Sequence, residues 1–196
     1  AADVALGVPE CTPEQARLIR RYVAACAYNT LSPDYVPPRE AGYGWGSANM
    51  MEALRARGAA MMVSLLPDHP DGERWRTFLV KFLLSNAGLK ISDAGATLEI
   101  GAYGQMALEF ATIPFLALSK AGDEVPWDAI LPRLRAAANH RLSYLLPHDV
   151  RGGFRPPAPI GDSPYHGENS LAYLIPVFAE RDPDLAANLL WGVKES

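Results

Sequence analysis

Two aromatic side chains and one amide gather where the second predicted helix begins, at 47–66. Tyr43, Trp45 and Asn49 lie within one short stretch. Exposed aromatic rings stack on the faces of sugars, and an amide can donate a hydrogen bond to a carboxylate without competing for its charge. A helix N-terminus adds backbone donors and a dipole that favours an anion. The stretch therefore suits an anionic sugar, although an inward-packed Trp45 and a helix-capping Asn49 would explain it equally well.

A second polar group lies at the start of a later predicted helix, at 98–121. Glu99 and Tyr103 are four residues apart and therefore share one helix face, with Gln105 close by. The small residues around them are Gly95, Gly101 and Gly104. A tyrosine hydroxyl can give or take a proton when neighbouring positive charge lowers its pKa. The alternative is a helix start capped by Asp93, with Tyr103 half-buried in the core.

The third group lies in a loop rich in proline and glycine, at 147–164, and just beyond it. Arg155 offers a planar fork that suits a carboxylate, and His166, next to Tyr165, is of the type that titrates near neutral pH. The structural alternatives are a surface or capping role for His166 and a turn-forming role for Asp162. The remaining histidines are weaker candidates: His69, His140 and His148.

Hydrophobic side chains that recur at helical spacing predict an all-α fold. The expected helices span 12–27, 47–66, 70–85, 98–121, 127–146, 168–179 and 184–194. The loops at 32–46 and 147–164 hold prolines and glycines that no helix interior tolerates. Consecutive antiparallel helices joined by long loops at one end favour helical hairpins around an axis over a compact bundle. The last helix is still apolar at its end, so we expect one helical domain over 1–196 that belongs to a longer protein.

The composition is that of an ordinary folded domain, with 196 residues, 49% of them hydrophobic and 20% charged. A net charge of -4 excludes the broad basic field that holds nucleic acid. No apolar run is long enough to cross a membrane. Cys11 and Cys26 are too few for a disulfide framework, and we expect Cys26 to be a buried free thiol. The motifs of zinc proteases, phosphate-binding loops and serine hydrolases do not occur.

The three groups, in this order, resemble the α/α-toroid region of heparinase II/III-like polysaccharide lyases and their alginate-lyase relatives. The matching stretches are 45–49 with the helix after it, 66–71 with Trp75, 93–105 and 160–163. The resemblance implies antiparallel hairpins that form part of an (α/α) toroid. The chain departs from the family at Met50, where many relatives have a histidine, and in Asp93-Ala94-Gly95, where the family has Asp-Gly. The family's toroid is longer and precedes a β-sandwich, so a missing segment or a second chain would complete this one.

For the site, the resemblance implies elimination beside a uronate carboxylate. Asn49 would neutralise the carboxylate so that the C5 carbanion is carried as an enolate, and Tyr103 and His166 would move the protons. The substrate-binding residues would be Tyr43, Trp45, Glu99, Gln105, Arg155 and Tyr165. The implied partner is an anionic polysaccharide or oligosaccharide, with no cofactor, metal, nucleic acid or membrane, and the implied location is secreted or periplasmic.

Two other functions fit the same residues. A glycoside hydrolase on such a toroid, acting on unsaturated uronides, would need two carboxyl groups at a suitable separation, with Glu99 and either Asp162 or Glu168 as candidates. A non-catalytic scaffold or carbohydrate-binding domain would need none of this chemistry. The sequence does not distinguish alginate from heparan sulfate, hyaluronan or other uronates.

Overall fold

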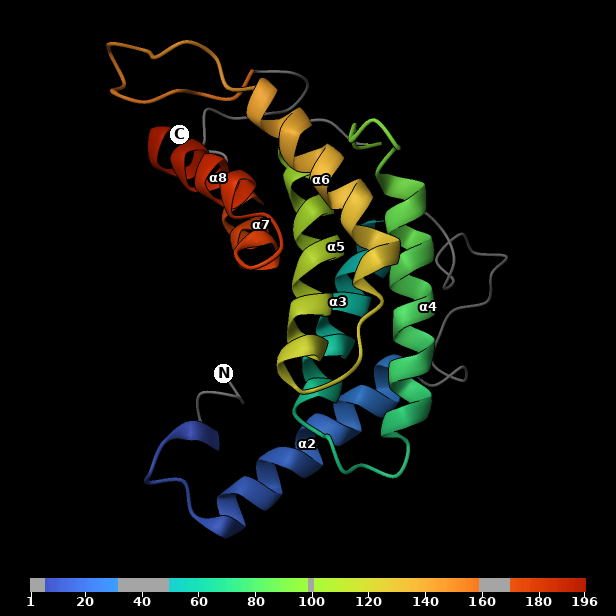
Figure 1. Cartoon of the computed structure of the whole chain (residues 1–196). Helices are drawn as coiled ribbons and strands as arrows, with labels where there is room; N and C mark the ends of the chain where they lie inside the picture. Colours follow the sequence, from blue (N-terminus) through green and yellow to red (C-terminus); the bar gives the residue numbers. More distant parts are fainter. Residues whose placement is uncertain (1–5, 32–49, 99–100, 159–169) are drawn as a thin grey trace.

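The computed structural model describes residues 6–31, 50–98, 101–158 and 170–196. Within these ranges the chain forms seven helices and no strand, which confirms the all-α prediction. The helices are α2 Pro13–Leu31, α3 Met50–Ser64, α4 Gly72–Lys90, α5 Gly101–Lys120, α6 Trp127–Ser143, α7 Ser170–Phe178 and α8 Pro183–Glu195 (Figure 1).

The helices from α3 onward form two rows. In one row α3 packs on α5 and α5 packs on α7, and in the other α4 packs on α6 and α6 packs on α8. Figure 1 shows that α3 and α5 begin at the same end, here called the upper end, and that α4 and α6 run back towards it. The opposite, lower end is where α3 ends and α4 begins, and α2 crosses it while packing on α3.

The start of α2 follows the sequence signal. Thr12 and Gln15 form a capping box, in which the Thr12 amide donates to Gln15 Oε1 (2.8 Å) and the Gln15 amide donates to Thr12 Oγ1 (3.2 Å). Of the apolar residues on this helix, Val23 is buried, but Leu18 and Tyr22 are exposed. A helix that lies across the end of a bundle contacts it along a narrow stripe, so only part of the apolar face of α2 is buried.

Helix α4 runs further than the sequence predicted. The turn-rich connection was expected from Asn86 onward, but α4 continues to Lys90, and both residues are buried. The expected stripe is confirmed at Trp75, Leu79, Phe82 and Leu83, which are buried, whereas Phe78 is exposed. Tertiary packing therefore carries this helix through residues whose types favour a turn.

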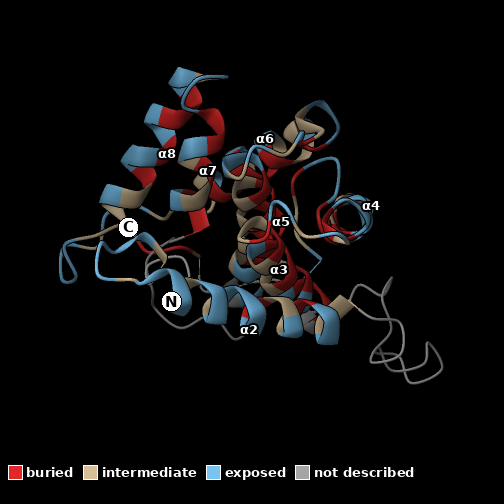
Figure 2. Ribbon diagram, turned by 90° about the horizontal axis from the view of Figure 1, so that it is seen from below, coloured by how far each residue is buried: buried red, intermediate tan, exposed pale blue. Residues whose placement is uncertain are grey.

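The core lies between the two rows, and α5 is its central helix. Along α5, Leu108, Phe115 and Leu118 are fully buried, and they meet Leu134 of α6 and Leu174 of α7 in one cluster. Figure 2 shows the buried faces of the helices turned inward, with α2 exposed along most of its length. Cys26 is half-buried rather than buried, and its thiol is free. Among the described residues, no helix is long and apolar enough to cross a membrane.

Candidate functional site

The three polar groups precede helices of one row. The first precedes α3, the second leads into α5, and the third precedes α7. Of the nine predicted site residues, the structure describes Tyr103, Gln105 and Arg155. The other six lie outside the described residues: Tyr43, Trp45, Asn49, Glu99, Tyr165 and His166.

Tyr103 stands in the first turn of α5, at the upper end. Its side chain is 53% exposed, so the alternative in which it is half-buried in the core is wrong. Gln105 is two positions further on and is half-buried, so the two side chains leave the helix on different faces. The phenol of Tyr103 is therefore accessible to a large substrate, whereas Gln105 is directed more towards the protein.

A tight turn between α4 and α5 fixes the approach to Tyr103. Gly95 adopts a φ of +86°, and a Cβ at this position would lie 2.2 Å from the backbone of Ala136 in α6. Asp93 forms an ion pair with Arg133 of α6 (2.7 Å), which also donates to the carbonyl of Ile91 (2.5 Å). The space that Gly95 leaves is thus occupied by α6, and the turn is clamped to that helix.

An ion pair joins α3 and α5 halfway along their length. Arg57 Nη1 lies 3.4 Å from Glu109 Oε2, and the Arg57 guanidinium sits 5.6 Å above the ring of Phe110. Burial raises the pKa of Glu109 above its ordinary value, and the positive charge of Arg57 opposes that rise. The pair adds a polar contact to the apolar packing of α3 on α5.

Arg155 belongs to a loop that is held against α8. Its amide donates to the carbonyl of Glu195 (2.5 Å), its Nε lies 3.5 Å from Glu195 Oε2, and its guanidinium lies 5.7 Å from the ring centre of Trp191. Within the loop, Asp149 and Phe154 form an isolated antiparallel β-bridge. Arg155 therefore already has an acidic partner, and a substrate carboxylate would compete with Glu195 for it.

Three buried charged side chains at the upper end were missed by the sequence analysis. They are Glu52 in the first turn of α3, Lys90 in the last turn of α4 and Arg141 in the last turn of α6, with exposures of 2%, 2% and 6%. Buried charges are costly and concentrate where a fold needs a defined electrostatic environment. No local pattern marked these three residues, because the helix ends around Lys90 and Arg141 are themselves rich in polar residues. Two of the three are cations and one is an anion.

Comparisons with models of protein families, with curated proteins and with solved structures find no match for this chain. Among the described residues, no three histidine, cysteine, aspartate or glutamate side chains gather as a metal site would require. What the described residues of the upper end offer is the accessible phenol of Tyr103 and three buried charged side chains.

Proposed function

We propose that the chain is part of an (α/α) toroid that binds an anionic polysaccharide and cleaves it beside a uronate by β-elimination. One observation carries the proposal: the three polar groups precede α3, α5 and α7, which are successive neighbours in a single row. Residues far apart in the sequence are in this way attached to adjacent helices, as a binding site requires.

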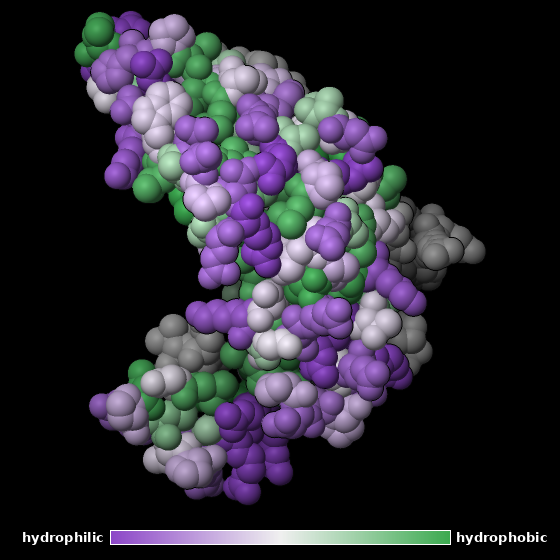
Figure 3. Space-filling model, in the orientation of Figure 1, coloured by the Kyte–Doolittle hydropathy of each residue, from purple (hydrophilic) through white to green (hydrophobic). Residues whose placement is uncertain are grey.

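The two-row packing supports the toroid. In a ring of antiparallel hairpins, alternate helices pack on each other as an inner ring and the helices between them pack as an outer ring. The α3–α4 and α5–α6 hairpins follow that order, and α7 packs on α5 while lying across its direction (Figures 1 and 2). Figure 3 shows the surface hollowed between the part over α7 and α8 and the part over α2. Further hairpins, from another segment or a second chain, would complete the ring.

The proposed chemistry assigns one role to each residue. Asn49 masks the carboxylate of the uronate, so that removal of the C5 proton gives an enolate in place of a localised carbanion. His166 and Tyr103 take up the C5 proton and protonate the leaving oxygen, whose bond to C4 breaks as the C4–C5 double bond forms. The exposure of Tyr103 supports this role, because a proton carrier must reach a polymer.

The test is a pair of tyrosine variants assayed on a panel of uronate polysaccharides. Elimination produces a double bond conjugated with the carboxylate, which is followed by its ultraviolet absorbance, whereas hydrolysis produces none. Tyr103→Phe removes only the hydroxyl and should lower turnover by about 100-fold or more. Tyr22→Phe is the matched control, because Tyr22 is 72% exposed on α2, far from the first turn of α5, and should keep the full rate.

The outcomes separate the candidate functions. Unsaturated product formed by the wild type and lost only in Tyr103→Phe supports the lyase and identifies its sugar. New reducing ends without the absorbance would mean a hydrolase. Binding without any cleavage would mean a carbohydrate-binding domain, and equal rates in the two variants would remove Tyr103 from the mechanism.

A further inference from the structure

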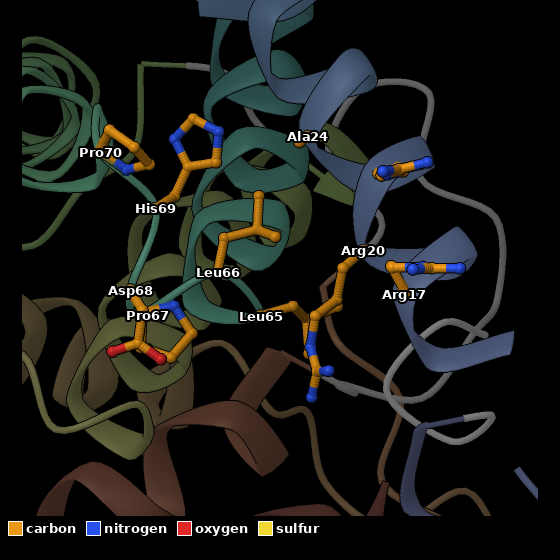
Figure 4. Close-up of a pocket in the computed structure, with 10 residues that line it drawn as sticks. Arg17, Arg20, Ala24, Leu65, Leu66, Pro67, Asp68, His69 and Pro70 are labelled. Carbon is orange, nitrogen blue, oxygen red and sulfur yellow. The ribbon is translucent and has the colours of Figure 1, made fainter. Parts of the chain in front are cut away.

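A pocket of about 580 Å³ lies at the lower end, between α2 and the turn that joins α3 to α4. Figure 4 shows Arg17 and Arg20 on the α2 side, the residues from Pro67 to Pro70 on the other side, and Leu65 and Leu66 between them. Helix α3 has 15 residues, which at about 1.5 Å per residue separates this pocket from the first turn of α5 by roughly 20 Å. The pocket is therefore distinct from the proposed catalytic site.

The α2 wall is strongly basic. Arg17, Arg20 and Arg21 all line the pocket, and all three are exposed. None of them forms an ion pair with an acid of the described residues. Among the described residues that line the pocket, Asp68 is the only acid, and it lies on the opposite wall. Three guanidinium groups thus face one shared space in a chain whose net charge is -4.

No ion pair among the described residues accounts for this arrangement. Arg17 is three residues from Arg20 and four from Arg21, so each pair lies on one helix face, where like charges repel. Asp71, which follows the pocket-lining Pro70, is already paired with Arg74 (3.2 Å) and with the hydroxyl of Tyr28. A ligand that supplies several negative charges would remove the repulsion.

The opposite wall of the pocket is rigid. The His69 ring stacks on Trp75 with ring centres 4.5 Å apart, and Tyr28 meets Trp75 edge-on at 4.9 Å. His69 Nδ1 also accepts a hydrogen bond from the amide of Asp71 (3.1 Å). This aromatic cluster fixes the turn before any ligand arrives, so binding costs little ordering on that side.

We propose that this pocket is a second saccharide-binding site, which holds carboxylated or sulfated sugars of the polymer away from the cleavage site. The choice of a sugar rests on the proposed function. Guanidinium forks match carboxylate and sulfate groups, while Leu65 and Leu66 offer an apolar floor to the C–H face of a sugar ring. The volume lies within the range of about 300–1,000 Å³ that is usual for small-molecule sites.

The experiment measures binding by isothermal titration calorimetry, in the Tyr103→Phe background so that no cleavage interferes. The probes are a heparin-derived hexasaccharide and sodium sulfate. Arg17→Gln/Arg20→Gln removes two charges from the pocket and should weaken hexasaccharide binding about tenfold or more. Lys81→Gln/Lys194→Gln removes two exposed charges elsewhere and should change it less than about twofold. Thermal unfolding of both variants checks that the fold is intact.

Each other result overturns the proposal. Equal weakening in the two double variants would mean that the whole charge of the protein attracts the probe. Sulfate binding as tightly as the hexasaccharide would make this a small-anion site. Absence of hexasaccharide binding in the parent protein would remove the site altogether.

A second readout separates this proposal from the proposed function. In the otherwise wild-type chain, Arg17→Gln/Arg20→Gln should slow cleavage of a long polymer and leave cleavage of a short oligosaccharide unchanged. Equal rates on the long polymer would remove the second site but keep the lyase. Pocket-dependent binding without any cleavage would remove the lyase but keep a saccharide site at the lower end.

Discussion

The two ends of the helix array use charged side chains in opposite ways. At the upper end Glu52, Lys90 and Arg141 are buried, each in a terminal turn of a different helix. At the lower end Arg17 and Arg20 are exposed around a pocket. Buried charges are held by the fold and set the geometry of what surrounds them, whereas exposed charges without partners remain available to a ligand. Charges at the upper end thus hold neighbouring groups in place, whereas the arginines at the lower end can attract an anionic ligand.

The largest expected effect tests the upper end through two lysines in equivalent places. Lys90 is 2% exposed in the last turn of α4, and Lys120 is exposed in the last turn of α5 at the lower end. Lys90→Ala should lower the free energy of unfolding by about 4 kcal/mol, because it removes a buried side chain together with its interactions. Lys120→Ala should cost less than about 0.5 kcal/mol. Urea unfolding measures both, and equal values would show that Lys90 contributes no more than a surface charge.

The next effect compares two glycines in turns at opposite ends. Gly95 and Gly122 have φ values of +86° and +90°, so alanine is strained at both. A Cβ added at Gly95 would also clash with the backbone of Ala136, whereas a Cβ added at Gly122 would have nothing within 4 Å. Gly122→Ala should cost about 1 kcal/mol from conformation alone. Gly95→Ala should cost about 3 kcal/mol, because α6 must move as well.

The structural consequence of Gly95→Ala gives a separate check. Since the turn at 91–98 leads into α5, displacing it should also disturb Tyr103, which Gly122→Ala should leave in place. NMR chemical shifts near Tyr103 measure this. Changes in Gly122→Ala but not in Gly95→Ala would contradict the proposed clamp between this turn and α6.

The sequence predicted the helices well where local signals and packing agree. The capping box of Thr12 and Gln15 marks the start of α2, and the spacing of Trp75, Leu79 and Phe82 marks the buried face of α4. The sequence prediction failed at the end of α4, because Asn86 favours a turn in isolation but is buried in a helix. Periodicity also shows an apolar stripe without showing how much of it a neighbour covers, so it does not distinguish the exposed Tyr22 from the buried Val23 on α2.

The candidate site was predictable only in part, for a physical reason. Residue type and spacing indicated that Tyr103 could do chemistry, but its exposure depends on how α5 packs on α3 and α7. The partner of Arg155 is Glu195, forty residues later, and no local pattern joins them. The basic face of α2 was visible as Arg17, Arg20 and Arg21, but only the turn after α3 makes it a pocket.

The smallest expected effect tests the lower end. If its arginines serve a ligand and not the fold, removing one should not destabilise the protein. Arg17→Gln removes the like-charge pairs with Arg20 and Arg21 and should raise the free energy of unfolding by about 0.5 kcal/mol at low salt. The gain should vanish near molar salt, where screening shortens electrostatic range to about 3 Å. A salt-independent loss of stability would instead mean that Arg17 packs as part of the fold, and the contrast between the two ends would fail.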